Sequence, residues 1–548
     1  MTEPGSTVSD VVARVVAAHA ATAFGVMGNG NAFFVNGLLG NGTRYVQTRH
    51  EAGAVAAADA YYRASGGLAV ATTTYGPGFT NALTPLTEAA QARIPLLYVA
   101  GAAPDAPRPW DVHQFAVSAG LGVPVIVVEN AEDAVRRTVQ AIRRALDERR
   151  PVYLALPSDI SESPASAASV ETELPPPTGL PGPDTADVET VAALLRAAER
   201  PLILGGRGVW LSGSGSRYAE IADRVGALLA TTAGARATFG ESPWDIGISG
   251  GFAPEETAAL IGEADVVLAV GAGLNPFTMR FGHALEPEAT LVHVDLDDSS
   301  RAPRVNRFVR ADAAVFADAL LGSLGTDARS GWRANVAERV QRAHLRDTDA
   351  SELTDDGRLD PRPVARDLDL LLPAGRTIVL DGGHFVGWPA EYWRADDPSG
   401  FLMVGSAYQT IGLGLPAAVG AAVARPDRLT VLATGDGGLQ MAIADLPVFI
   451  EQCTSGVIVV FNDGAYGAEL HQYGPRGLDI RPAQLGDVSF AAVAVAYGAR
   501  AATIRSLQDL EVLRTWVGEG AQGVLLLDCR VSPSVVAPFF EEIRSLPH

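Results

Sequence analysis

The residues with the clearest chemical potential lie at positions 435–438, where the chain reads Gly-Asp-Gly-Gly. They follow an apolar run at 429–433, and a second apolar run at 457–461 ends in Asn462 and Asp463. Ligands of parallel sheets collect beyond the carboxyl ends of the strands. Carboxylate and amide oxygens suit Mg²⁺, which proteins often share with phosphates. We expect a helix over 439–452 whose N-terminus faces that phosphate; the alternative is an ordinary turn with a capping aspartate.

The spacing between the two acidic positions favours a cofactor site. Asp463 follows Asp436 by 27 residues. With this motif the chain resembles the thiamine diphosphate-dependent enzymes of the acetolactate synthase, pyruvate decarboxylase and benzoylformate decarboxylase superfamily. Their cofactor motif begins with Gly-Asp-Gly and closes with Asn-Asn, where this chain has Asn-Asp. The resemblance implies metal ligation by Asp436, by Asp463 and by the Ala465 carbonyl. Counting from Asn462 selects that side chain and the Gly464 carbonyl instead, and both readings stay open.

A second chemical element lies in the first part of the chain. The run at 45–49 reads as a strand, and it leads through His50 into Glu51 and an alanine-rich helix. Alone, Glu51 could be an acid favoured by the helix dipole, an effect worth about 0.3–1 kcal/mol. The resemblance implies that Glu51 is the glutamate that activates the cofactor through a hydrogen bond to its pyrimidine ring.

The resemblance extends to further cofactor contacts. His384 is expected to donate to the diphosphate, the Gln409 carbonyl to accept from the aminopyrimidine, and Ile411 to bend the cofactor. The remaining expected cofactor residues are Gly76 and Asn81 in the first block, and Gly383, Phe385, Gly435, Gly437, Gly438, Tyr466, Gly467 and Ala468 in the third.

The expected substrate-facing residues are polar. Asn29, or less favourably Asn31, lies in a loop that brings a polar side chain over the substrate in the family, and His113 and Gln114 fall where relatives place His or Gln. Glu469 falls where pyruvate decarboxylase-like enzymes have a glutamate, so with His113 it could protonate the product carbanion. The alternatives are that His113 is an ordinary surface histidine and that Glu469 lies on a solvated helix face. Tyr473 stands where acetolactate synthases carry a tryptophan.

Composition excludes several function classes. The chain has 548 residues and a net charge of −21, so nucleic acid and anionic membranes are unfavourable partners. Its 42 basic residues are all arginine, which rules out lysine Schiff-base chemistry and a Walker lysine. Cys453 and Cys529 give no zinc spacing or disulfide framework. We found no signal peptide or apolar run long enough for a membrane span, and we expect a cytoplasmic protein.

Two polar linkers, at 157–186 and 345–363, divide the chain into three blocks. Each block alternates apolar strand-like runs with helical stretches, which predicts an α/β fold of three doubly wound domains with mainly parallel sheets. The resemblance implies a pyrimidine-binding domain at 1–165, a central domain at 187–344 and a diphosphate-binding domain at 360–548. The central block has glycines at 205, 206 and 208 but lacks an acidic-arginine pattern at 271–276, so bound FAD is not favoured.

The sequence therefore predicts a thiamine diphosphate- and Mg²⁺-dependent enzyme that decarboxylates a 2-oxoacid, joins the resulting acyl group to a second carbonyl, or does both. Alternatives are a C–C lyase that acts on an acyloin or diketone, and a flavin-containing oxidoreductase. The expected substrates are small 2-oxoacids or aldehydes. Family precedent implies a homodimer or homotetramer with active sites between subunits.

Overall fold

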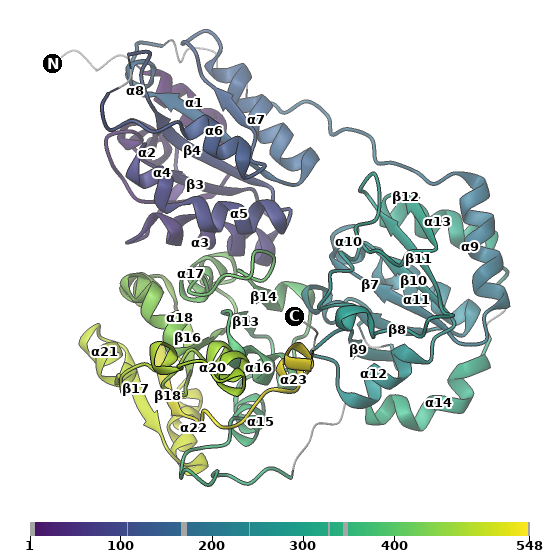
Figure 1. The fold of residues 1–548 in the computed structure, drawn as a ribbon. Helices are drawn as coiled ribbons and strands as arrows, with labels where there is room; N and C mark the ends of the chain where they lie inside the picture. Colours follow the sequence, from purple (N-terminus) through teal and green to yellow (C-terminus); the bar gives the residue numbers. More distant parts are fainter. Residues whose placement is uncertain are drawn as a thin grey trace.

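The computed structural model describes residues 6–106, 108–165, 172–240, 242–326, 329–343 and 349–545, so parts of both expected linkers lie outside the described residues. The described residues form three six-stranded sheets with helices around them (Figure 1). Every strand pair within the three sheets is parallel. The prediction of three doubly wound α/β domains is confirmed.

The first sheet has the strand order β2-β1-β3-β4-β6-β5. Its strands are β1 (Thr22–Gly25), β2 (Arg44–Gln47), β3 (Ala69–Thr73), β4 (Leu96–Ala102), β5 (Val125–Val127) and β6 (Pro151–Pro157). The accompanying helices are α1 (Val8–Ala17), α2 (Ala32–Gly40), α3 (Glu51–Ser65), α4 (Pro77–Asn81), α5 (Leu83–Gln91), α6 (Gln114–Gly120), α7 (Ala134–Glu148) and α8 (Ser158–Ser161). Strands β3 and β4 are buried along their whole length, as expected for a sheet covered on both faces.

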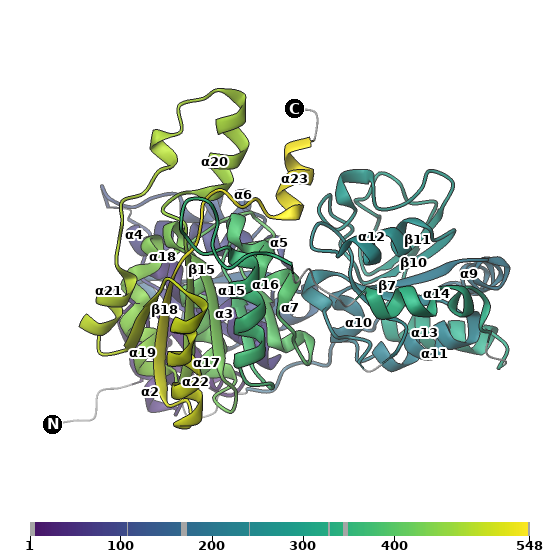
Figure 2. The ribbon, with the colours of Figure 1, turned by 90° about the horizontal axis from the view of Figure 1, so that it is seen from below.

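The central sheet has the order β12-β11-β10-β7-β8-β9. Its strands are β7 (Pro201–Gly205), β8 (Leu228–Thr231), β9 (Asp245–Ile248), β10 (Val266–Val270), β11 (Thr290–Asp295) and β12 (Arg307–Arg310). Its helices are α9 (Thr185–Ala197), α10 (Arg207–Leu211), α11 (Gly215–Val225), α12 (Glu255–Gly262), α13 (Ala313–Ser323) and α14 (Gly331–Arg342). Figure 2 shows this sheet beside the other two domains, with the last helix of the chain reaching toward it.

The third sheet has the order β14-β13-β15-β16-β18-β17. Its strands are β13 (Thr377–Leu380), β14 (Phe401–Met403), β15 (Thr430–Gly435), β16 (Ser455–Asn462), β17 (Arg500–Ile504) and β18 (Gly523–Arg530). Its helices are α15 (Pro361–Leu371), α16 (Gly387–Tyr392), α17 (Gly414–Ala424), α18 (Asp436–Ala442), α19 (Leu446–Gln452), α20 (Gly467–Tyr473), α21 (Phe490–Ala496), α22 (Glu511–Gly518) and α23 (Pro538–Ser545). The strand order reverses between β13 and β15, which is where such sheets bind ligands.

The single helix expected over 439–452 is wrong. The structure has α18 from Asp436, a 3₁₀ turn at Ile443–Asp445, and then α19. Pro447 lies in the first turn of α19, where its missing N–H and its effect on the preceding residue favour a new helix start over a continuous helix. The break places Asp445 in the turn between the two helices.

Helices α3 and α17 join the first and third domains. Their buried alanines belong to one apolar core shared by both domains. At Gly420 the helices approach so closely that an added Cβ would lie 1.9 Å from the carbonyl oxygen of Ala57. Only glycine fits at this crossing.

We therefore expect Gly420→Ala to lower the free energy of unfolding by about 3 kcal/mol, because backbone atoms cannot move aside locally. Thermal unfolding of the full chain measures the loss. Gly262→Ala is the matched control, since an added Cβ there meets nothing within 4 Å. Equal midpoints for the two variants would contradict the close crossing.

Two negative expectations concern membranes and thiols. None of the described helices is long and apolar enough to cross a membrane. Cys453 and Cys529 are both buried free thiols.

Candidate active site

Two carboxylates meet at the carboxyl ends of neighbouring strands. Asp436 is the first residue of α18, and Asp463 follows the end of β16, which pairs with β15. Their carboxyl groups lie close enough for each to shift the pKa of the other. Burial, and then the charge of Asp436, raise the pKa of Asp463 to about 8, and burial raises the pKa of Asp436 as well. Two neighbouring like charges, one on buried Asp436 and one on half-buried Asp463, call for a bound cation or a shared proton.

The Asn462 side chain makes hydrogen bonds away from Asp436. Its side-chain amide is buried and donates to the Asp528 carboxylate at 2.9 Å and to the Val488 carbonyl at 3.3 Å. Asp463 instead accepts from the Ala465 N–H at 3.0 Å, which folds the loop around its carboxylate. The geometry thus favours Asp463 over Asn462 as the partner of Asp436. Among the described residues no group of three or more His, Cys, Asp or Glu side chains is arranged to hold a metal.

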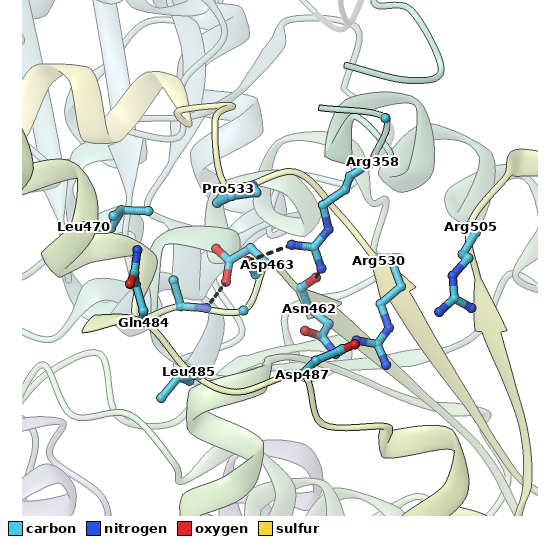
Figure 3. Close-up of a pocket in the computed structure, with 13 residues that line it drawn as sticks. Arg358, Asn462, Asp463, Leu470, Gln484, Leu485, Asp487, Arg505, Arg530 and Pro533 are labelled. Carbon is cyan, nitrogen blue, oxygen red and sulfur yellow. Dashed lines mark hydrogen bonds and ion pairs between the residues drawn. The ribbon is translucent and has the colours of Figure 1, made fainter. Parts of the chain in front are cut away.

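An arginine fixes the outer side of this loop. Arg358 donates to the carbonyl of Asp463 at 3.1 Å and to that of Asn462 at 3.5 Å (Figure 3). It lines a cavity of about 630 Å³, and Arg505 and Arg530 line the same cavity. Sequence reasoning missed Arg358, because it lies 105 residues before Asp463 and no local pattern marks it.

Several glycines of the third domain lie in close contact with neighbouring side chains. An added Cβ at Gly437 would lie 2.5 Å from the ring of Tyr466, and at Gly435 it would meet Phe385. The Phe385 ring also stacks on Phe461, so it belongs to the core. Gly467 lies against Asp463 and His384, while Ala468 is half-buried beside the same core. The absence of a Cβ at these glycines lets the loop backbones lie directly against the side chains of Tyr466, Phe385 and His384.

Asp381 ties those loops together, and the sequence analysis did not select it as a site residue. Its buried carboxylate accepts from the amides of Gly382 and Gly412 and from the Thr434 hydroxyl, at 2.8, 2.9 and 3.1 Å. An added Cβ at Gly438 would lie 2.5 Å from it. The pKa of Asp381 is raised by burial. It holds the turn before Gly383, where φ is +136°, beside the segment that carries Ile411.

His384 has a defined tautomer. The Ala537 N–H donates to its Nε2 at 2.8 Å, so in the neutral ring the proton is on Nδ1. Burial, together with nearby His471, lowers the pKa of His384 to about 3 and keeps the ring neutral. Phe539 and Phe540 of α23 lie against the same ring. The C-terminal segment therefore closes over this side of the site and leaves Nδ1–H as the available donor.

The first domain supplies a second cluster. The Asn81 side chain donates to Glu51 Oε2 at 2.9 Å, and Gly78 lies against the other carboxylate oxygen. Gly76, with φ +60°, starts the short helix that ends in Asn81. The Gln114 amide oxygen accepts from the Gly76 N–H at 2.9 Å.

The expected substrate-facing residues divide into two groups. Asn29, His113 and Glu469 are exposed in the single chain. Gln114 is buried and also donates to the Gly101 carbonyl and the Tyr153 hydroxyl, so it anchors the Gly76 turn. Asn31 is likewise buried and holds its own loop through Gly28, Val26 and Thr72. The structure thus leaves Asn29, rather than Asn31, open to a ligand.

Three family models cover most of the chain. The N-terminal thiamine pyrophosphate (TPP)-binding domain of thiamine pyrophosphate enzymes matches residues 6–118, the central domain matches 188–321, and the C-terminal TPP-binding domain matches 381–529. This chain belongs to the thiamine pyrophosphate enzymes. The two carboxylates and the glycine loops lie in the C-terminal match, and Glu51 with Asn81 lies in the N-terminal match.

Curated relatives of this thiamine pyrophosphate enzyme have different reactions in their names. A probable acetolactate synthase large subunit of Methanocaldococcus jannaschii is 27% identical over 95% of each chain. A probable 2-ketoarginine decarboxylase of Pseudomonas aeruginosa is 29% identical over 93% of this chain and 91% of its own. A sulfoacetaldehyde acetyltransferase of Alcaligenes xylosoxydans xylosoxydans is 26% identical over 89% and 86%. The family models show the family to which this chain belongs, whereas the named relatives do not identify the reaction that it catalyses.

Proposed function

We propose that this thiamine pyrophosphate enzyme binds thiamine diphosphate with Mg²⁺, decarboxylates a small 2-oxoacid, and passes the acyl group to a second carbonyl or releases it as an aldehyde. The observation that carries the proposal is the Asp436–Asp463 pair at the ends of adjacent strands. Two neighbouring, mutually repelling carboxylates beside glycine loops suit a divalent cation that is shared with a diphosphate.

The chain's own residues fit the cofactor. Asp436, Asp463 and the Ala465 carbonyl would hold the metal, and Nδ1–H of His384 would donate to the diphosphate. Glu51, oriented by Asn81, would hold a proton at the pyrimidine ring. Bound thiamine diphosphate supplies a carbon nucleophile for a ketone carbonyl and an electron sink for the loss of CO₂.

The active site is proposed to form between two copies of the chain. Glu51 starts α3, whereas Arg63, near the other end of α3, donates to the Met403 carbonyl in the strand leading to Gln409 and Ile411. Twelve helical residues separate the two ends by about 18 Å. Glu51 and the Gln409–Ile411 segment of one chain therefore face different sites. A homodimer, or a homotetramer of such dimers, would complete both.

Residues on the substrate side set the outcome of the proposed reaction. Exposed Glu469, His113 and Asn29 would line the site when a second copy covers it, and Glu469 with His113 would deliver the proton that releases an aldehyde. The small side chain of Ala468 leaves room for an acyl group larger than acetyl. Cleavage of an acyloin or diketone uses the same groups in reverse and is the alternative reaction.

A flavin-dependent reaction is not favoured. In the central domain, the loops after β7 and β10 touch where a dinucleotide would bind, and an added Cβ at Gly206 would lie 2.1 Å from the Gly271 carbonyl oxygen. Arg207 next to it donates to the Ala92 carbonyl of the first domain, and Arg93 pairs with Asp295 and Asp297. These contacts support a structural role for the central domain.

The test is turnover of a panel of 2-oxoacids, aldehydes and acyloins with and without added thiamine diphosphate and Mg²⁺. We expect CO₂ release from at least one 2-oxoacid, and we expect it to require both additions. Aldehyde as the product supports the role of Glu469, and C–C bond formation without free aldehyde contradicts that role. Turnover that needs neither addition overturns the proposal.

A further inference from the structure

Two buried carboxylates outside the metal pair reach across the boundary between the first and third domains. Asp445 and Glu88 are 2% and 0% exposed. Each accepts a backbone N–H from the opposite domain at 2.7 Å. The proposed chemistry uses neither of them, and a hydrogen bond from a backbone amide to a buried carboxylate is stronger than one between neutral groups.

Asp445 acts from the third domain on the first. Its Oδ1 accepts from the N–H of Arg49, two residues before Glu51. Its Oδ2 lies against Gly53, where an added Cβ would be 2.0 Å away. The glycine in the first turn of α3 is thus what admits the carboxylate. The break between α18 and α19 puts Asp445 in position for this contact.

Glu88 acts from the first domain on the third. Its Oε2 accepts from the N–H of Tyr408, next to Gln409. Arg63 lies 3.3 Å from its Oε1 and also binds Asp59, so the carboxylate is held by a buried network within the first domain. Gln409 itself has φ +57°, an uncommon conformation for a residue with a side chain. Such a conformation persists only where the surroundings impose it.

We propose that Asp445 and Glu88 are reciprocal positioning residues: Asp445 fixes the loop that presents Glu51, and Glu88 fixes the loop that presents Gln409 and Ile411. The assignment of these loops to the cofactor rests on the proposed function. The contacts themselves do not. The two loops of one chain face different sites. Within one chain, Asp445 therefore positions a loop of one site, and Glu88 positions a loop of the other.

The first test follows amide hydrogen exchange in the full chain without cofactor. We expect Asp445→Ala to speed exchange about tenfold or more at residues 48–51, and Glu88→Ala to do so at 405–409. Asp445→Asn and Glu88→Gln keep an acceptor oxygen, so they should restore most of the protection and remain folded if the alanine variants do not. Asp312→Ala is the matched control, since Asp312 is a buried carboxylate that accepts from the amides of Ala314 and Val315 in the central domain.

Asp312→Ala should show faster exchange at 313–316 and unchanged exchange at 48–51 and 405–409. Unchanged exchange at 48–51 and 405–409 in the alanine variants overturns the proposal, and so does faster exchange spread evenly over the first and third domains, because that result indicates general destabilisation.

The second test separates this inference from the proposed function. With thiamine diphosphate and Mg²⁺ added, Asp445→Ala should lower kcat at least tenfold with little change in the cofactor concentration that half-maximally raises Tm. Glu88→Ala should raise that concentration at least tenfold. Faster loop exchange with wild-type kcat and wild-type cofactor affinity would show that the contacts hold the loops but that the loops do not serve the cofactor. In that case the positioning contacts stand and the assignment of these loops to the cofactor fails. If the wild-type chain instead shows no turnover that depends on thiamine diphosphate, the proposed function fails, while faster loop exchange in the alanine variants still upholds the positioning contacts.

Discussion

Glu51→Gln should reduce turnover by about 10²–10⁴-fold while binding of thiamine diphosphate and Mg²⁺ stays near wild type. Glutamine fills the same space beside Asn81 and Gly78, but it cannot hold or release a proton at the pyrimidine ring. The loss should therefore fall on kcat. Steady-state kinetics give kcat, and the cofactor-induced rise in Tm gives binding independently of turnover.

Subunit mixing turns the same variant into a test of the site between chains. Glu51→Gln chains are combined with Asp463→Ala chains, each of which is inactive alone. A hybrid dimer then has one site with both defects and one site with neither. Random pairing of equal amounts should restore about a quarter of wild-type activity, because half of the dimers are hybrids and each has one intact site.

A mixture that stays inactive after demonstrated subunit exchange would show that each chain builds its own site. That outcome would contradict the argument from the length of α3. Wild-type turnover in Glu51→Gln alone would remove Glu51 from the chemistry, and it would leave the metal pair to be explained in another way. Asn81→Ala is a graded companion variant: it keeps the carboxylate but removes the donor that orients it, so it should lose less activity than Glu51→Gln.

The parts of the site that could be predicted are those written in short stretches of sequence. Asp436 and Asp463 follow apolar strands, and neighbouring parallel strands end at the same edge of a sheet, so strand prediction alone brings them together. Glu51 lies at a strand-to-helix junction that is visible in the residue pattern. The three α/β domains follow from the alternation of apolar runs with helical stretches, which is local information repeated along the chain.

The parts that could not be predicted depend on side-chain direction and on distant partners. The choice between Asn462 and Asp463 depends on where β16 ends, because successive side chains point to opposite faces of a strand. Asn462 is the last strand residue and turns toward Asp528, which lies 66 positions later. Arg49 and Asp445 are 396 residues apart, and their contact depends on a helix break that periodicity does not reveal.

The metal pair leads to the second prediction with a large effect, a stabilisation by Mg²⁺ that grows with pH. Burial and the Asp436 charge raise the pKa of Asp463 to about 8, far above the usual value near 3.9 for aspartate. Protonation of the pair therefore stabilises the metal-free fold at low pH, and this stabilisation is lost as the pH rises toward 8. A divalent cation needs both carboxylates ionised, so its binding must displace more protons at pH 6 than at pH 8.5.

We therefore expect the rise in Tm caused by Mg²⁺ to be clearly larger at pH 8.5 than at pH 6. Asp463→Asn removes one charge and keeps an oxygen ligand, so it should still respond to Mg²⁺ but with a weaker dependence on pH. Asp463→Ala should lose the response.

Asn462→Ala is the control. It leaves both carboxylates in place, so it should keep the pH-dependent response to Mg²⁺. It should also lose about 1–3 kcal/mol of stability, because buried Asp528 loses the side-chain amide that donates to its Oδ1. A response to Mg²⁺ that survives in Asp463→Ala and disappears in Asn462→Ala would assign the metal to Asn462. It would also mean that the bond between Asn462 and Asp528 must break before the cation can bind.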